Sequence, residues 1–244
     1  MSAAVPPLSL PLSLKDNPRL DRWLRFNPDR TVTVRSGKVE LGQGIVTAIA
    51  QIAAEELDVS LDRLQLVTGD TSASPDEWYT AGSQSIEVGG LAMRLACAEA
   101  RLLFLQAAAR ELEVGAEELQ VNDGVIGIPG TDVRTSYWDL APRVSLARDA
   151  TGTAPPKPVA AHTVVGKSEP RRDLAAKLSG AGYVHHLDLP RLRPLLLKVS
   201  LQQRVFRVER EIDLRLIAPS VGLNQLPDAV RTTERSQNPN GITI

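Results

Sequence analysis

Between residues 21 and 148, the hydrophobic side chains change repeatedly between a spacing of two residues and a spacing of three to four. The first spacing is typical of a strand with one buried face, and the second is typical of a helix. β-Branched residues dominate Thr31–Arg35, apolar residues at helical spacing run from Ile45 to Ile52, and Leu64–Val67 is again strand-like. This alternation predicts a strand, a helix and a second strand, and restricts the chain to folds that mix both elements.

A long second helix is predicted from about Glu87 to Glu113. Beyond it, Leu119–Val121 and Val125–Ile128 flank Asn122-Asp123-Gly124, a sequence that favours a tight hairpin turn. The order strand, helix, strand, helix and hairpin predicts an α+β domain in which helices cover a sheet in two layers. The predicted apolar positions of the long helix are Leu91, Leu95, Ala98, Leu102 and Leu105.

The charge balance and the cysteine count exclude several kinds of function. The 244 residues include 28 Lys and Arg and 29 Asp and Glu, giving a net charge of −1, so no basic surface for nucleic acid is expected. The single cysteine, Cys97, excludes an internal disulfide, a zinc knuckle and a cysteine-ligated iron–sulfur cluster within these residues. Three histidines leave little for a metal site built from side chains.

The N-terminus and the hydropathy of the chain bear on its location. No apolar run approaches the roughly 18 residues that a membrane span needs. Residues 1–14 alternate Leu with Ser and Pro and lack the early positive charge of a signal peptide, so we expect a tail there. We therefore expect a cytoplasmic protein without a membrane span.

The segment Gly37–Gly44 contains two glycines, Gly42 and Gly44, on either side of Gln43 and directly before the first predicted helix. Glycine allows a tight turn and a close approach of a ligand to the backbone. We expect unpaired N–H groups at the start of this helix, which suit a phosphate or another electron-rich group. Gln43 offers both a hydrogen-bond donor and an acceptor. The alternative is a turn that only caps the helix, since a short Gly-x-Gly segment is a weak signal.

A second segment of small and hydroxyl side chains, Thr80–Ser85, precedes the long helix. It is a potential cradle for a polar ligand, and the alternative is an ordinary helix cap. Two such segments before consecutive helices can face one ligand. The nearby Asp70, Asp76 and Glu77 are expected to be loop carboxylates with roles in turns.

The order and spacing of these segments resemble the molybdopterin-binding large subunit of the xanthine dehydrogenase/aldehyde oxidase family. Within that family, the similarity is to the isoquinoline 1-oxidoreductase and nicotinate dehydrogenase type. It covers roughly residues 15–190. The matching segments are Asn17–Trp23, Gly37–Gly44, Ile52–Leu57, Ser74–Glu77, Thr80–Ser85 and Val165–Asp173.

The resemblance implies a molybdenum–molybdopterin cofactor, with the cytosine dinucleotide form as one option. In the family, the Gly-Gln-Gly turn binds the pterin, and the second loop lies against the pterin and the molybdenum centre. No side chain of this chain is implied as a metal ligand, because the dithiolene of the cofactor supplies sulfur. The implied cofactor-binding residues are Gly42, Gln43, Gly44, Thr80, Ala81, Gly82, Ser83 and Ser85.

The resemblance also implies an oxidoreductase that hydroxylates an N-heterocycle or an aldehyde with oxygen from water. Electrons then leave through iron–sulfur clusters on a partner small subunit to an acceptor such as a cytochrome, while the cofactor performs the difficult chemistry. The family's catalytic Glu, in a Gly-x-Gly-Glu segment, and its Gly-Gly-Phe-Gly loop have no counterpart in these 244 residues. We therefore predict no catalytic residue here and expect the chain to be incomplete as a catalyst. Trp78 stands where the family usually has a small residue, and His186 where it usually has Asp.

Composition and resemblance together predict five parts. Residues 1–20 form an extended arm, 21–148 the molybdopterin-binding α+β domain, 149–160 a Pro-rich linker, 161–190 the start of a hammerhead-like domain, and 191–244 a divergent tail. Two explanations of the tail stay open. It is either a genuine ending, with a basic amphipathic helix, or an out-of-frame sequence after about residue 190, which we favour.

Two other functions remain as alternatives. The chain can be a non-catalytic remnant or interaction module that binds no cofactor. It can also be an unrelated phosphate- or nucleotide-binding domain, but the glycines are followed by no Walker lysine and form no G-x-G-x-x-G, so this ranks last.

Several other residues are expected to have structural roles. Cys97 is expected to be a buried thiol. Tyr137 and Trp138 are expected on the packed face of a short helix. His185 and His186 are expected to point to opposite sides of a strand.

Overall fold

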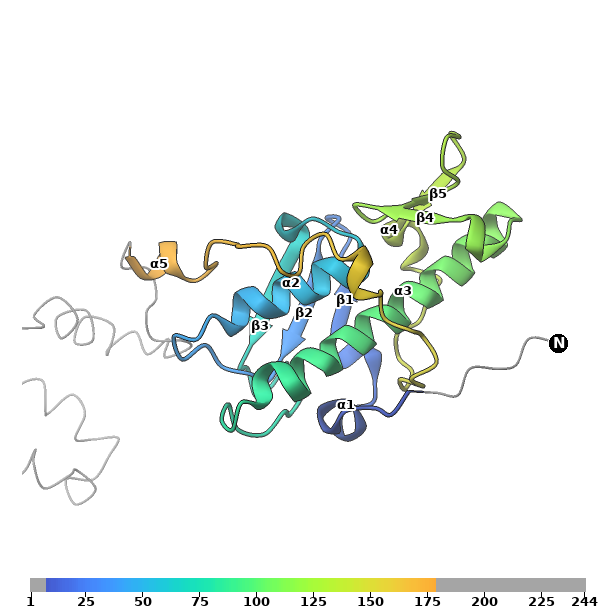
Figure 1. The fold of residues 1–244 in the computed structure, drawn as a ribbon. Coiled ribbons are helices and arrows are strands. Elements are labelled where there is room, and N and C mark those ends of the chain that lie inside the picture. The colour runs from blue at the N-terminus through green and yellow to red at the C-terminus, as the bar shows by residue number, and fades with distance from the viewer. Residues whose placement is uncertain (1–7, 179–244) are drawn as a thin grey trace, which may run out of the picture. The chain divides into compact units, whose positions relative to one another are not determined.

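The computed structural model describes residues 8–178 (Figure 1). Its first sheet contains β1 (Leu24–Phe26), β2 (Val32–Ser36) and β3 (Leu64–Thr68), in the order β1-β2-β3. β1 and β2 are antiparallel, whereas β2 and β3 are parallel, with Val34 opposite Leu66. The two strands predicted from hydrophobic spacing are confirmed.

Two helices cover one face of this sheet (Figure 1). α2 (Ile45–Leu57) connects β2 to β3, and α3 (Leu91–Leu112) follows β3 and packs beside α2. Fully buried residues of β2, α2 and α3 belong to one hydrophobic core. The predicted two-layer α+β arrangement is confirmed. None of the helices in residues 8–178 combines the length and the apolar composition that a membrane crossing requires.

The long helix differs from its prediction at its start and in its buried face. Residues Ser85–Gly90 form a turn of π-helix, and α3 begins only at Leu91. Leu91 itself is exposed, so the predicted stripe is wrong there. Small side chains let helices approach closely, whereas hydropathy favours the larger Leu residues, which explains the error. The most buried residues lie one to three positions from the predicted ones: Ala92, Met93, Ala96, Cys97, Ala100, Phe104 and Ala108.

A second, antiparallel sheet contains β4 (Gln120–Asn122), β5 (Val125–Gly127) and β6 (Arg134–Ser136), followed by α4 (Tyr137–Leu140). The predicted hairpin is confirmed, with Val121 opposite Ile126. Tyr137 is fully buried, and its ring lies 5.1 Å from Phe26 and 5.0 Å from Phe104. The predicted packing of Tyr137 and Trp138 is therefore confirmed, and it joins the second sheet to the main core.

The N-terminal and C-terminal segments of the described region contact this core. The expected arm contains α1 (Leu12–Asp16), whose Leu14 is fully buried. The expected linker at 149–160 runs against α2 and α3, as Figure 1 shows. α5 (Leu174–Leu178) is the last described helix. Short 3₁₀ turns occupy Leu20–Arg22, Leu61–Arg63, Ala116–Glu118 and Val159–Ala161.

The five-part division of the chain remains a prediction. The expectations for His185, His186 and the 191–244 tail lie outside the described residues. Cys97 is fully buried as expected, and burial, together with the neighbouring Glu56 carboxylate, raises the pKa of its thiol well above the usual value.

Candidate functional site

The two loops singled out in the sequence leave the sheet at the same edge. β2 and β3 are parallel, so residues 37–44 after β2 and residues 69–84 after β3 both start at the C-terminal ends of strands. Ligands of open α/β sheets commonly bind at such an edge. A hydrogen bond from the N–H of Val39 to Oγ1 of Thr80, at 2.9 Å, joins the two loops directly.

A buried lysine connects the loops beneath this contact. Lys38 is 1% exposed, and its Nζ donates to the carbonyl oxygens of Glu77 at 2.6 Å and Tyr79 at 3.1 Å. A buried ammonium group needs such partners, since an unsatisfied one is expensive to desolvate. Lys38 therefore holds the backbone just before Thr80 against the loop that follows β2.

Glu77 forms the other half of this connection. Its Oε2 accepts hydrogen bonds from Oγ of Ser36 at 2.6 Å and from the N–H of Gly37 at 2.7 Å. The expected turn role is wrong for Glu77, which is buried, whereas Asp70 and Asp76 accept from nearby backbone N–H groups as expected.

The position of Glu77 explains why the π turn is rich in glycine. A Cβ at Gly89 would lie 2.6 Å from Oε1 of Glu77 and 3.2 Å from Cε of Lys38, so a side chain has no room there. Oε1 is itself buried and has no hydrogen-bond partner among the described residues. π-Turns are frequent at functional sites, which makes this junction part of the candidate site.

The N–H groups at the start of α2 are not free, contrary to expectation. Oε1 of Glu40 accepts from the N–H of Gly42 at 2.8 Å and of Gly44 at 2.9 Å, and Oε2 accepts from Val46 at 3.2 Å. Burial disfavours the charge of Glu40, yet these N–H groups outweigh burial and lower its pKa. An ionised carboxylate of the chain itself therefore occupies the place where an external anion was expected.

The outer side of the turn remains open. Gly42 and Gly44 have φ values of 109° and 81°, and a Cβ at either would meet nothing within 4 Å. Only glycine readily adopts a φ near 109°, so the turn needs a glycine at position 42. Gln43 is exposed; its amide donates to the carbonyl of Val39 at 2.9 Å and accepts from the N–H of Leu41 at 2.6 Å. One amide N–H and one lone pair of Gln43 stay available to a ligand.

The second loop exposes most of its predicted residues. Ala81, Gly82 and Ser83 are exposed, while Thr80 and Ser85 are half-buried. A Cβ at Gly82 would meet only Cγ of Gln84, at 3.9 Å. Of the eight predicted cofactor residues, Gly42, Gln43, Ala81, Gly82 and Ser83 are exposed, and Gly44, Thr80 and Ser85 are half-buried. These features fit the polar edge of a flat organic group.

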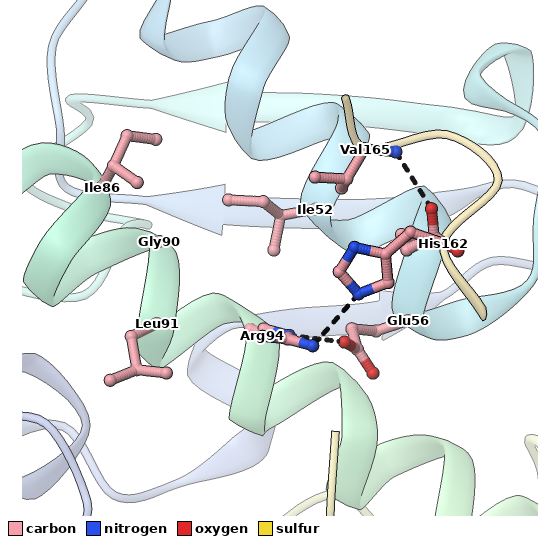
Figure 2. Close-up of a pocket in the computed structure, with 9 residues that line it drawn as sticks. Ile52, Glu56, Ile86, Gly90, Leu91, Arg94, His162 and Val165 are labelled. Atoms are coloured by element: carbon pink, nitrogen blue, oxygen red, sulfur yellow. Dashed lines mark hydrogen bonds and ion pairs between the residues drawn. The ribbon is translucent and has the colours of Figure 1, made fainter. Parts of the chain in front are cut away.

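A pocket of about 250 Å³ lies between α2, the π turn, α3 and the segment around His162, and none of the eight predicted residues lines it. Figure 2 shows Arg94 held between Glu56 and His162, while Ile52 and Ile86 provide apolar walls. Nε of Arg94 lies 2.7 Å from Glu56, and Nη2 lies 3.1 Å from Nε2 of His162.

Sequence reasoning missed several residues of this region. No local pattern pairs Lys38 with Glu77 or Arg94 with His162, because the partners lie 39 and 68 residues apart. Glu40 did carry a local signal, since a negative charge near the start of a helix is stabilising.

Comparisons with known proteins place the chain in a family. The sequence model of a family described as "Molybdopterin cofactor-binding domain" matches residues 6–169. The chain is 34% identical over 171 residues to a nicotinate dehydrogenase subunit of Pseudomonas putida, covering 70% of this chain and 14% of that protein. It is 29% identical over 197 residues to the beta subunit of isoquinoline 1-oxidoreductase from Brevundimonas diminuta, covering 65% of this chain and 25% of that protein.

Among solved structures, reconstituted CO dehydrogenase from Oligotropha carboxidovorans is similar at 26% identity and a TM-score of 0.45. That similarity covers 52% of this chain and 16% of the other. The chain thus spans between about a seventh and a quarter of the length of the two curated relatives.

Proposed function

Because the chain belongs to the molybdopterin cofactor-binding domain family, we propose that its two loops bind the pterin part of a molybdenum cofactor. The observation that supports this most is the open outer side of Gly42, Gly44 and Gly82 at one edge of the sheet. At these positions a ligand can approach the backbone more closely than any side chain would allow. The bound pterin would lie against the open side of Gly42, Gly44 and Gly82.

Each predicted residue has a role that its surroundings permit. Gln43 uses its remaining amide N–H and lone pair on polar atoms of the pterin. The hydroxyls of Ser83 and Ser85 and the backbone of Ala81 and Gly82 contact the cofactor from the second loop. Glu40 does not bind it, because its carboxylate already accepts from the turn. Its role is to hold the turn in shape.

The chemistry belongs to an assembly larger than this chain. When bound, the cofactor supplies oxidation of a substrate carbon with oxygen taken from water. Nicotinate and isoquinoline, which appear in the names of two relatives, are N-heterocycles, so we extend this substrate class, or an aldehyde, to the assembly. Its remaining parts include an iron–sulfur small subunit and an electron acceptor such as a cytochrome. The cytosine dinucleotide form of the cofactor and a cytoplasmic location belong to the same proposal.

A second candidate is an interaction module that binds no cofactor. The observation in its favour is that Glu40 fills the anion position at the start of α2. A phosphate cannot bind there while Glu40 is ionised, so any cofactor contact must use the outer side of the turn.

The test is the molybdenum and pterin content of the protein purified from its native host with its partners. We expect near-stoichiometric amounts in the wild type. Gly44→Asn adds a side chain to the open side of the turn at φ 81°, which Asn tolerates. We expect its affinity for the pterin to fall at least about tenfold, equivalent to about 1.4 kcal/mol of binding free energy, and its pterin content to fall as a result.

Gly130→Asn is the matched control. Gly130 has a φ of 76° and open space around it, but it lies between β5 and β6, away from the two loops. Its pterin content should equal that of the wild type. A wild type without pterin and molybdenum would contradict the proposal and support the interaction module.

A further inference from the structure

The segment after Gly166 returns to the glycine turn and contacts it through one arginine. Nη1 of Arg171 donates to the carbonyl of Gly42 at 2.7 Å, across 129 residues of sequence. Nη2 of Arg171 lies 3.4 Å from Oε1 of Glu40. Arg171 therefore contacts both the backbone of the turn and the carboxylate that shapes it.

Arg171 is itself held in place by its neighbours. Its Nε and Nη2 donate to the two carboxylate oxygens of Asp173, at 3.1 and 2.7 Å, which fixes the plane of the guanidinium. Lys177 lies 2.6 Å from the same carboxylate. These hydrogen bonds hold the pKa of Asp173 well below its usual range, so the carboxylate stays ionised.

The turn depends on Arg171 for two reasons. Glu40 accepts from the N–H groups of Gly42 and Gly44, and Arg171 donates to the carbonyl of Gly42, so both backbone polar groups of Gly42 are bonded. Glu40 is also a nearly fully buried charge, and Arg171 is its ion-pair partner. Without Arg171, a glycine-rich turn with many accessible conformations loses the hydrogen bond that links the carbonyl of Gly42 to this segment.

We propose that Arg171 is a positioning residue for the cofactor-binding turn, holding Gly42 and Gln43 in the orientation that contacts the pterin. This inference rests on the proposed function. It also means that residues 166–177, expected to start another domain, complete the site of the first. The turn then has its binding shape only while this segment is in place.

Arg172 provides the matched control. It is the next residue and carries the same charge, but its guanidinium donates to the carbonyls of Leu61 and Leu64, at 3.1 and 3.2 Å. Arg172→Met therefore removes an equally charged side chain and its backbone hydrogen bonds, yet leaves the contacts to Gly42 and Glu40 intact.

The experiment compares wild type, Arg171→Met, Arg171→Lys and Arg172→Met, each as the full chain purified with its partners from the native host. The readouts are pterin per polypeptide, hydrogen exchange of the peptide spanning residues 38–50, and the midpoint of thermal unfolding. We expect Arg171→Met to lose about tenfold in pterin content, as typical for residues that orient ligand-binding groups. Exchange in residues 38–50 should accelerate in this variant only.

Arg171→Lys should recover part of the pterin content, because Lys keeps the charge and one hydrogen bond but cannot form the paired contact with Asp173. Equal pterin in Arg171→Met and wild type would overturn the role of Arg171 and leave the proposed function standing. Equal losses in Arg171→Met and Arg172→Met, with equal falls in unfolding temperature, would also overturn it, since they indicate general destabilisation. A wild type without pterin overturns the proposed function itself.

Discussion

Trp78 has a backbone conformation that suits its side chain poorly. Its φ is 59°, in the left-handed region, and the side chain is exposed on the loop before Thr80. Its indole Nε1 donates to Oδ2 of Asp16 at 3.1 Å, which is a solvent-exposed hydrogen bond. The left-handed conformation costs roughly 1–2 kcal/mol for a residue with a Cβ.

Trp78→Gly is expected to raise the free energy of unfolding by up to about 1 kcal/mol. Relief of the backbone strain exceeds the roughly 0.4–1 kcal/mol that the freer unfolded chain of glycine costs. Urea denaturation at pH 7 measures the difference. Tyr79→Gly is the control, because Tyr79 is also exposed but is not among the residues with positive φ, and it should lower stability. A Trp78→Gly variant less stable than Tyr79→Gly would show that the side chain, not the strain, dominates.

At the scale of elements, buried glutamates on the two helices bind the segment that covers them. Glu99 of α3 accepts from the N–H groups of Thr151 and Gly152. Oε2 of Glu55 on α2 accepts from three successive N–H groups at 163–165, at 2.6 to 2.9 Å. Carboxylates with several N–H partners are strongly stabilised as anions. The segment beyond residue 148 is therefore attached to the helix layer by charged hydrogen bonds.

Protonation of Glu55 should lower the stability of the protein in acid. Burial opposes its charge, but the three N–H groups and Lys157 outweigh burial and lower its pKa below the usual 4.5. A lowered pKa in the folded state contributes stability that is complete above the unfolded-state pKa and is lost as the pH falls through the folded-state value. Glu55→Gln should therefore flatten the fall of the unfolding midpoint below about pH 4.5.

The same variant should lose about 1–3 kcal/mol of stability at pH 7, since Gln cannot offer a charged acceptor to these N–H groups. Thermal unfolding from pH 3 to pH 7 measures both effects. Glu117→Gln, at an exposed position, is the control and should follow the wild type. If the unfolding midpoint of Glu55→Gln falls below about pH 4.5 as steeply as that of the wild type, other carboxylates, such as Glu40, control the loss of stability in acid.

At the scale of the whole molecule, large apolar side chains are exposed around the candidate site. Leu41 is 71%, Trp78 66% and Tyr79 81% exposed, and all three lie on the two loops at one edge of the sheet. Large exposed apolar side chains near one another commonly mark an interaction site. Since the chain covers only 14% of the related nicotinate dehydrogenase polypeptide, we expect other polypeptide to cover this edge in the assembly.

The isolated chain should therefore self-associate. We expect the triple variant Leu41→Ser/Trp78→Ser/Tyr79→Ser to shift sedimentation velocity profiles toward the monomer. Val125→Ser/Val133→Ser removes exposed apolar residues from β5 and from the residue just before β6, and should leave association unchanged. A wild-type chain that sediments as a single monomer with a cooperative melt would contradict the expectation.

The sequence by itself determined the main strands and helices of the first sheet layer, the hairpin and the location of the two loops. Hydrophobic spacing is a local property, so Val32–Ser36, Ile45–Leu57 and Leu64–Thr68 were predictable as strand, helix and strand. The hairpin was also predictable, because Asp123-Gly124 favours its turn wherever it stands. The glycines of the first loop marked the candidate site for the same reason, since their need for positive φ is intrinsic to the residue.

Only the tertiary structure decided which charged groups do what. Glu40, Glu77 and Glu55 are alike in sequence, yet one shapes a turn, one joins two loops and one binds a covering segment. The contact between Arg171 and Gly42 depends on residues 129 positions apart meeting at one edge. A carboxylate or guanidinium has no preferred partner until packing removes it from water, and its role then follows from the N–H, C=O or charge that the fold brings to it.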